Sequence, residues 1–175
     1  MASKTPISLE SHLAGLRTAI AKRLEELPKL LAAQNAAQER LDADPTDFEL
    51  LTQAASAYED VTITLGLIVR YQMELRINQL LRHIYHHPMS KDPKLQAELP
   101  RILNQFCHRA GTYFAHPDND GPCFLVGYAD KYGMKFMLQD VGSKKRSHTT
   151  RDLRTLLPLR LYDVPTYLWP AAPAR

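Results

Sequence analysis

Apolar residues recur every three or four positions through most of the first 85 residues, a spacing that places them on one face of an α-helix. The first stripe steps by 4, 3, 4, 4, 3 and 4 residues through Leu9, Leu13, Leu16, Ile20, Leu24, Leu27 and Leu31. A second stripe of similar spacing runs from Leu50 to Ile84. Because only residues 42–44 separate the two stripes, they predict antiparallel neighbours, either a helical hairpin or a coiled-coil arm.

Helix start signals place the boundaries. A side chain that caps a helix stands directly before proline at Thr5-Pro6, Asp44-Pro45 and Asp92-Pro93. These pairs predict helices from about Pro6 to Leu41, from about Pro45 to Tyr85, and from Pro93 to about Arg109. Pro28 and Pro100 fall inside two of them, where a missing backbone donor should kink or divide the helix.

The sequence turns strand-like after residue 111. Two apolar runs, Pro122–Tyr128 and Met134–Gln139, flank a polar segment that ends in Gly133. That pattern predicts a β-hairpin whose turn closes on a left-handed glycine. Further short strands are predicted at Thr112–Ala115, Ser147–Thr150 and Leu153–Leu159. Strands this short cannot bury a core as an open sheet, so we expect them to curl into a small barrel.

Charge changes at the same point of the chain. Residues 1–121 carry 13 Lys and Arg against 15 Asp and Glu, whereas residues 122–175 carry 9 against 4. The basic surface should therefore lie on the C-terminal part, which we expect to begin near residues 111–121.

Three C-terminal motifs resemble the Tudor fold of the SAGA-associated tandem-Tudor factor family. They are the strand Lys135–Val141, the basic turn and strand Lys144–Thr149, and the closing run Leu156–Leu159. The resemblance implies an α+β protein in which a helical hairpin or coiled coil precedes a small SH3-like (Tudor) β-barrel. The expected divisions are a helical region at 6–110, a barrel at 112–164 and a flexible tail at 165–175.

The resemblance also implies a peptide-binding barrel. Asp140 matches an acidic position of that family, in which one Tudor domain offers carboxylates to the amino terminus of histone H3. Aromatic rings at a barrel mouth attract methylated ammonium groups through cation–π contacts. The predicted peptide-binding residues are Tyr113, His116, Phe124, Tyr128, Phe136 and Asp140.

Two other functions remain open from the residues. A basic set could contact nucleic-acid phosphates, with binding that weakens as salt rises. This set consists of Lys144, Lys145, Arg146, Arg151 and Arg154. Alternatively, the chain is a protein-only interaction factor such as a small inhibitor, in which the barrel only covers the helices.

Enzymatic chemistry has weak support in the sequence. His83, His86 and His87 could share a helix face, but no second pair of ligands follows at metal-site spacing, so we predict no metal. Cys107 lies beside Phe106 on an apolar stripe, where a buried, inert thiol is the usual case. Nucleotide-binding glycine motifs are absent from the sequence. We therefore expect no cofactor and no catalytic residues.

Together these observations predict a non-enzymatic adaptor subunit of a chromatin complex of the histone acetyltransferase type. Its barrel would bind a histone H3 tail or another protein tail, and its helical arm would join a larger assembly or a second copy. Two widely separated cysteines fit a reducing compartment, and no apolar run is long enough for a signal peptide or a membrane span. The expected location is the nucleus, or the cytoplasm if the resemblance fails.

Overall fold

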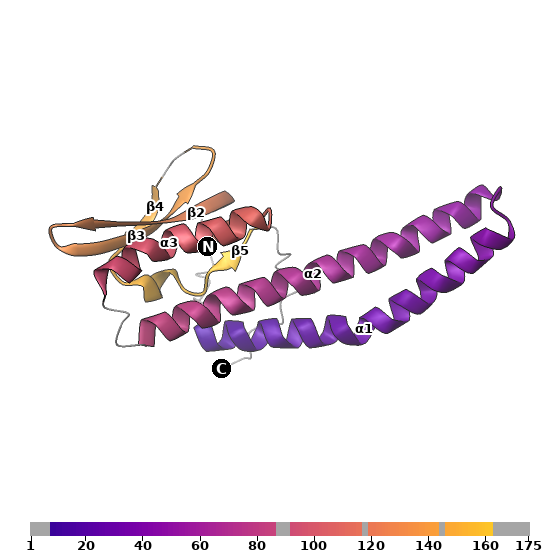
Figure 1. Ribbon diagram of the computed structural model, residues 1–175, viewed down its shortest axis with the longest axis horizontal. Coiled ribbons are helices and arrows are strands. Elements are labelled where there is room, and N and C mark those ends of the chain that lie inside the picture. Colours follow the sequence, from indigo (N-terminus) through magenta and orange to yellow (C-terminus); the bar gives the residue numbers. More distant parts are fainter. Residues whose placement is uncertain (1–7, 87–91, 117–118, 144–145, 163–175) are drawn as a thin grey trace, which may run out of the picture.

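The computed structural model describes residues 8–86, 92–116, 119–143 and 146–162. Two long helices, α1 (Leu9–Ala43) and α2 (Phe48–His86), form an antiparallel hairpin. Figure 1 shows this hairpin extending as an arm from a base that contains a third helix, α3 (Pro93–Arg109), and a small sheet. None of the helices in the described part of the chain combines the length and the apolar character needed to span a bilayer.

Aspartate and serine side chains begin all three helices. The Ser8 hydroxyl accepts a hydrogen bond from the Ser11 N–H at 3.2 Å, and Asp92 accepts one from Lys94 at 2.9 Å. Asp47 accepts from the N–H groups of Glu49 and Leu50, at 2.7 and 3.2 Å. The second helix therefore starts three residues later than the Asp44-Pro45 pair predicts, and Thr5-Pro6 lies outside the described residues.

Neither internal proline divides its helix. The first helix is continuous through Pro28 and the third through Pro100, so the expected division of either helix does not occur. Figure 1 shows that the axis of α1 bends partway along the arm while α2 bends with it. Packing against the partner helix holds the two sides of such a bend together.

The C-terminal part is a five-stranded antiparallel sheet. Its strands are β1 (Phe114–His116), β2 (Asn119–Asp130), β3 (Gly133–Asp140), β4 (Arg146–Thr150) and β5 (Arg160–Leu161). Their order is β4-β3-β2-β1-β5, so β4 and β5 are the edges and the sheet is not closed. The α+β class and the small antiparallel sheet after two long helices are confirmed.

The β2–β3 hairpin agrees with its sequence pattern. Leu125 pairs with Leu138, and the ladder runs without interruption to Asp130 and Gly133. Gly133 has a φ of +110°, a conformation that L side chains rarely adopt, and the Asp130 carboxylate accepts the Tyr132 N–H at 2.8 Å.

The prediction of a strand at Leu153–Leu159 is wrong. Residues Leu153–Leu156 form a 3-10 helix (η2), which begins where the Asp152 carboxylate accepts the Arg154 N–H at 3.0 Å. Pro158 then has no N–H to give to a ladder, so strand pairing starts only at Arg160. Apolar spacing in this run reflects burial of Leu153, Leu156 and Leu159 under the sheet rather than strand alternation.

One hydrophobic core joins the base of the arm to the sheet. It combines Leu16 and Tyr71 from the arm with Leu103 from α3 and with Leu125 and Phe136 from the sheet. Each of these side chains is at most 3% exposed. The helical and strand-rich segments of the sequence therefore pack around a common core.

The third helix covers the β1 side of β2, where β1 has ended. The Asn104 amide donates to the Leu125 carbonyl at 2.6 Å and accepts the Leu125 N–H at 3.2 Å, taking the place of a neighbouring strand. Two residues along, Gly127 lies against Pro100, and a Cβ atom at Gly127 would stand 2.7 Å from the Pro100 Cγ.

We expect Gly127→Ala to lower the free energy of unfolding by about 1–3 kcal/mol, because the added methyl group overpacks this contact. This loss of stability should be smaller in a chain that also carries Pro100→Ala, because that change removes the Pro100 Cγ that the added methyl group would contact. Urea unfolding of the four chains measures the coupling. Gly66→Ala is the matched control, because open space surrounds that position and alanine favours helix there. An equal loss with or without Pro100 would contradict the packing.

A buried polar cluster ties the arm to the outer edge of β5. The His12 Nε2 lies 2.8 Å from the Glu74 Oε1, and both side chains are 0% exposed. The other Glu74 oxygen accepts the Leu161 N–H at 2.8 Å. One turn further along α2, the Asn78 amide accepts the Leu159 N–H at 2.8 Å and donates to the Leu159 carbonyl at 2.6 Å.

These bonds give the β5 backbone partners that a further strand would otherwise supply. Burial raises the pKa of Glu74, while its bonds to His12 and Leu161 act in the opposite direction. Because the cluster spans α1, α2 and β5, it fixes the direction in which the arm leaves the sheet.

Candidate peptide-binding face

The sheet has one face packed on the helices and one face turned away from them. Successive strand residues alternate between the two faces, so Leu125 and Phe136 face the core while Phe124, Val126 and Tyr128 share the other face. Opposite them on β3 stand Gln139, Met137 and Lys135. We call the half-buried aromatic part of this surface, formed by Tyr113, Phe124 and Tyr128, the aromatic face.

Its rings make a continuous strip along β2. Tyr113, directly before β1, meets Phe124 edge to face, with ring centroids 5.3 Å apart and an interplanar angle of 81°. Tyr128 lies four residues further along, or ~13 Å at the rise of a strand. The three rings and Val126 between them are partly accessible, so an extended segment laid along β2 could contact them all.

Charged groups close one end of the strip at the β2–β3 turn. Asp130 receives two hydrogen bonds from one Arg151 nitrogen, at 2.7 and 3.0 Å, and lies 3.1 Å from the Lys135 Nζ. Its bond to Arg151, with smaller contributions from the Tyr132 N–H and Lys135, holds the pKa of the Asp130 carboxyl well below its usual range. The same pairing raises the pKa of Arg151.

The chain's own cations lie over the rings at this end. Lys131 lies 4.8 Å and Arg151 5.5 Å from the Tyr132 ring centroid, and Lys135 lies 6.0 Å from that of Tyr128. Sequence reasoning did not select Asp130, Tyr132 or Lys135. The cross-strand pairing of the hairpin, in which Tyr128 faces Lys135, was the signal that could have found them.

Three of the six predicted peptide-binding residues come together, namely Tyr113, Phe124 and Tyr128. The other three do not join them. Phe136 is 3% exposed in the core and so cannot contact a surface ligand. Asp140 ends β3, where it accepts the Ser143 N–H at 2.5 Å, and His116 is half-buried at the end of β1.

The predicted phosphate-binding residues are partly committed to carboxylates. Arg151 bonds to Asp130, and Arg154 bonds to Asp152 at 2.6 to 2.9 Å. Arg146 belongs to β4, but its side chain, like all of Lys144 and Lys145, lies outside the described residues. Each intramolecular carboxylate lowers the positive charge left for a phosphate.

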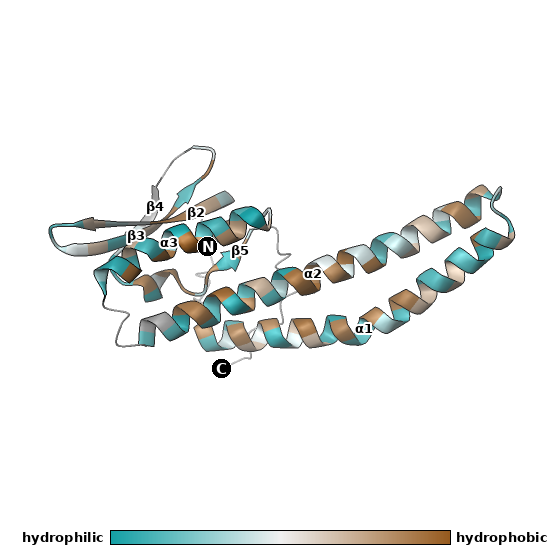
Figure 2. Cartoon of the chain, viewed as in Figure 1, coloured by the Kyte–Doolittle hydropathy of each residue, from teal (hydrophilic) through white to brown (hydrophobic). Residues whose placement is uncertain are grey.

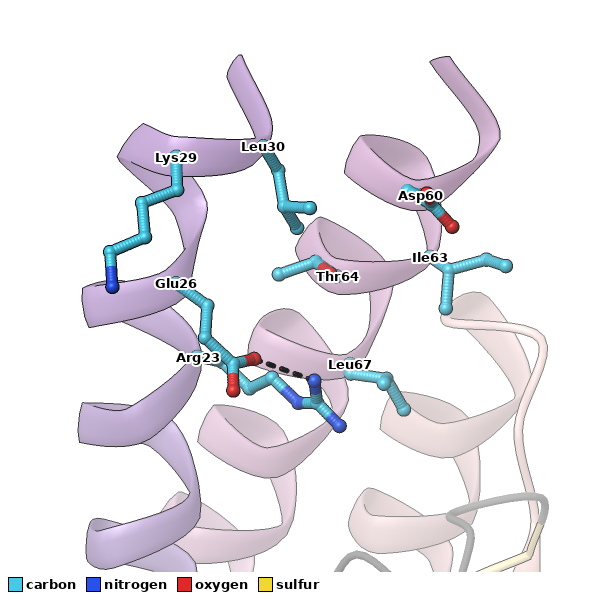
Figure 3. Close-up of a pocket in the computed structure, with 8 residues that line it drawn as sticks. All are labelled: Arg23, Glu26, Lys29, Leu30, Asp60, Ile63, Thr64 and Leu67. Carbon is cyan, nitrogen blue, oxygen red and sulfur yellow. Dashed lines mark hydrogen bonds and ion pairs between the residues drawn. The ribbon is translucent and has the colours of Figure 1, made fainter. Parts of the chain in front are cut away.

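A separate cleft lies on the arm, between α1 and α2, with a volume of about 480 Å³. Figure 3 shows its mixed lining, in which an Arg23–Glu26 ion pair of 2.7 Å stands beside Leu30, Ile63 and Leu67. The cleft is open and combines single charges with aliphatic walls, so it offers no concentrated set of groups for catalysis.

The described residues do not assemble a metal site or a reactive thiol. No three His, Cys, Asp or Glu side chains among them could hold an ion, and His83 and His86 are exposed at the end of α2. Burial raises the pKa of the Cys107 thiol to about 12, which makes it a poor nucleophile. Cys123 is also fully buried.

Comparisons with known protein families, with curated proteins and with solved structures found no match for this chain. The aromatic face is therefore interpreted from its own geometry.

Proposed function

We propose that this chain is a non-enzymatic adaptor, in which the sheet is an SH3-like (Tudor) domain that binds a protein tail along the aromatic face. The arm formed by α1 and α2 carries this domain and makes the contacts of assembly. The observation that carries the proposal is the strip of Tyr113, Phe124 and Tyr128 on the sheet face turned away from the helices.

The order of the strands supports the SH3-like assignment. Four strands follow one another in space as β1-β2-β3-β4, and the chain then passes through the 3-10 helix η2 to add β5 beside β1. SH3-like and Tudor domains have this connectivity, in which β5 returns to the first strand. The strongly buried Met137, on the face opposite the main core, fits a sheet that curls over that face.

The chemistry of the face suits an extended peptide. Half-buried aromatic side chains supply large, stiff contact area with little loss of conformational freedom, and Gln139 and Thr149 border the strip with hydrogen-bonding groups. The resemblance to the tandem-Tudor family makes the histone H3 tail the first ligand to test, in a nuclear complex. Because Lys131, Lys135 and Arg151 already lie over the rings at the turn, binding should not require trimethyl-lysine.

We expect Phe124→Ala and Tyr128→Ala each to weaken tail binding by about 10-fold or more, because each removes a large contact from the strip. Isothermal titration or fluorescence anisotropy with a labelled tail peptide measures the dissociation constant. Ile63→Ala, on the arm and 52% exposed, is the control that should leave binding unchanged. Circular dichroism verifies that each variant is folded.

Equal affinities for wild type and both aromatic variants would contradict the proposal. Charge reversal at Arg154 tests the nucleic-acid alternative in the same series. If duplex DNA binds and this change weakens it while both alanine variants leave it intact, the sheet is an electrostatic module rather than a tail reader.

A further inference from the structure

The middle and outer parts of the arm expose an apolar surface that nothing in the chain covers within the described residues. Six side chains between 40% and 62% exposed form it, and we call them the arm face: Leu24, Leu31, Leu51, Tyr58, Leu65 and Val69. Figure 2 shows hydrophobic residues recurring along both helices toward the far end of the arm. Exposed apolar patches of this extent usually mark interaction surfaces.

These residues lie on one side of the hairpin. Leu65 follows Thr64, which is 4% exposed, and Leu31 follows Leu30, whose side chain points toward α2 in Figure 3. A step of one residue turns each helix by about 100°. Because the two helices are antiparallel, the same step along each chain leads to the same side of the pair.

The opposite side of the arm differs in charge. There Glu26, Lys29 and Asp60 surround the cleft drawn in Figure 3. The arm face has no such groups, since its six residues and the small Ala55 and Thr62 between them are all uncharged. A partner of strong net charge would therefore find nothing to pair with on this side.

We propose that the occupant of the arm face is the arm face of a second copy of this chain, in an antiparallel four-helix bundle. The sequence of α2 is self-complementary about Tyr58. With Tyr58 on a two-fold axis, Leu51 lies level with Leu65 of the second copy. Ala55 then lies within one residue, or about 1.5 Å along the axis, of Thr62, and Phe48 lies equally close to Val69. Large residues thus face large ones and small residues face small ones, as an isologous interface requires.

The α2 stripe also has the right repeat. Leu51, Ala55, Tyr58, Thr62, Leu65 and Val69 step by 4, 3, 4, 3 and 4 residues, the heptad spacing of paired helices. On each copy, the arm face exposes on the order of 500 Å² of apolar surface that a dimer could bury. With Phe48, which is 79% exposed, and the bordering polar groups, that approaches the ~800 Å² per partner of stable interfaces.

The sheet does not obstruct this pairing. It is held to α2 through Glu74 and Asn78, which lie roughly 160° and 200° around the helix from Tyr58. The sheet therefore packs on the side of α2 away from the arm face. The dimer would carry its two sheets at opposite ends of the bundle, so that two tails, or two segments of one partner, could be bound at once.

Sedimentation velocity on the full chain tests the inference. We expect a dimer at micromolar concentration, and Tyr58→Glu should raise its dissociation constant at least ~100-fold, because two carboxylates would meet on the axis. Ile63→Glu is the matched control. Ile63 is similarly exposed at 52% and lies on the same helix but faces the cleft, so this variant should remain dimeric.

Cysteine cross-linking tests the antiparallel arrangement. Tyr58→Cys should form an intermolecular disulfide under mild oxidation, whereas Leu51→Cys should not, because two copies of position 51 would lie ~20 Å apart. The native Cys107 and Cys123 are buried and should not interfere. A monomer at all concentrations, equal disruption by both glutamate variants, or cross-linking through position 51 would overturn the proposal.

Discussion

Replacement of His12 by leucine is expected to lower the free energy of unfolding by about 3–5 kcal/mol. His12 is 0% exposed, and its imidazole is 2.8 Å from a carboxylate that is equally buried. Without this partner, Glu74 keeps the Leu161 N–H and the more distant positive charge of Arg160, in a site that water does not reach. Removing one partner of a buried pair is far more damaging than removing both, because a charge remains without compensation.

The double change His12→Leu with Glu74→Gln should recover most of that loss, to within about 1–2 kcal/mol of wild type. Glutamine carries no charge but still offers an oxygen to the Leu161 N–H. Chemical unfolding of wild type, both single variants and the double variant measures the coupling. Losses that simply add would contradict a coupled buried pair.

The stabilities of the same variants are expected to depend on pH. Burial raises the pKa of Glu74 above its ordinary 4.5, so the folded protein favours the protonated carboxyl. Its contribution is fully present below pH 4.5 and is lost as the pH rises through the raised pKa. The stability deficit of His12→Leu relative to the double variant should therefore widen as the pH rises above 4.5.

Replacement of Asn78 by leucine should lower the free energy of unfolding by about 2–5 kcal/mol. Leucine has a similar size but leaves the Leu159 N–H and carbonyl buried without their 2.8 and 2.6 Å bonds. Each buried backbone group that loses its partner costs about 1–3 kcal/mol. The measurement is urea unfolding, with hydrogen exchange of the Leu161 amide as a local readout of β5.

Asn104→Leu is the control for this change. The Asn104 amide makes two bonds of the same kind, to the N–H and carbonyl of Leu125, but it is only partly buried. Water can therefore replace these bonds, and the free energy of unfolding should fall by less. A larger loss at Asn104 than at Asn78 would show that β5 is not held by the arm.

The helices and the hairpin were predictable because their signals are local. Apolar spacing defines α1, α2 and α3 to within a few residues, aspartates mark the starts of α2 and α3, and Gly133 marks the turn. The last strand was missed because Asp152 starts a 3-10 helix and Pro158 delays pairing. Strand alternation also left open which of the predicted peptide-binding rings were exposed, since Phe136 could be assigned to the core only once its partner Gly127 was known.

Long-range polar contacts gave no signal in the sequence. His12, Glu74 and Asn78 are ordinary surface residues on a helical wheel, and only the docking of β5 more than 80 positions away explains their burial. The first apolar stripe also misled in part. Leu13 and Leu16 are buried in the hairpin, but Leu24 and Leu31 turn away from it and join the arm face.

The most direct test is a titration of the purified chain with unmodified and trimethylated histone H3 tail peptides, at low and raised salt, beside a duplex DNA of random sequence. We expect both peptides to bind with similar affinity and to remain bound as salt rises, because apolar contacts with the aromatic face dominate. If neither peptide binds, and if DNA binds with an affinity that falls steeply as salt rises, the adaptor function is contradicted.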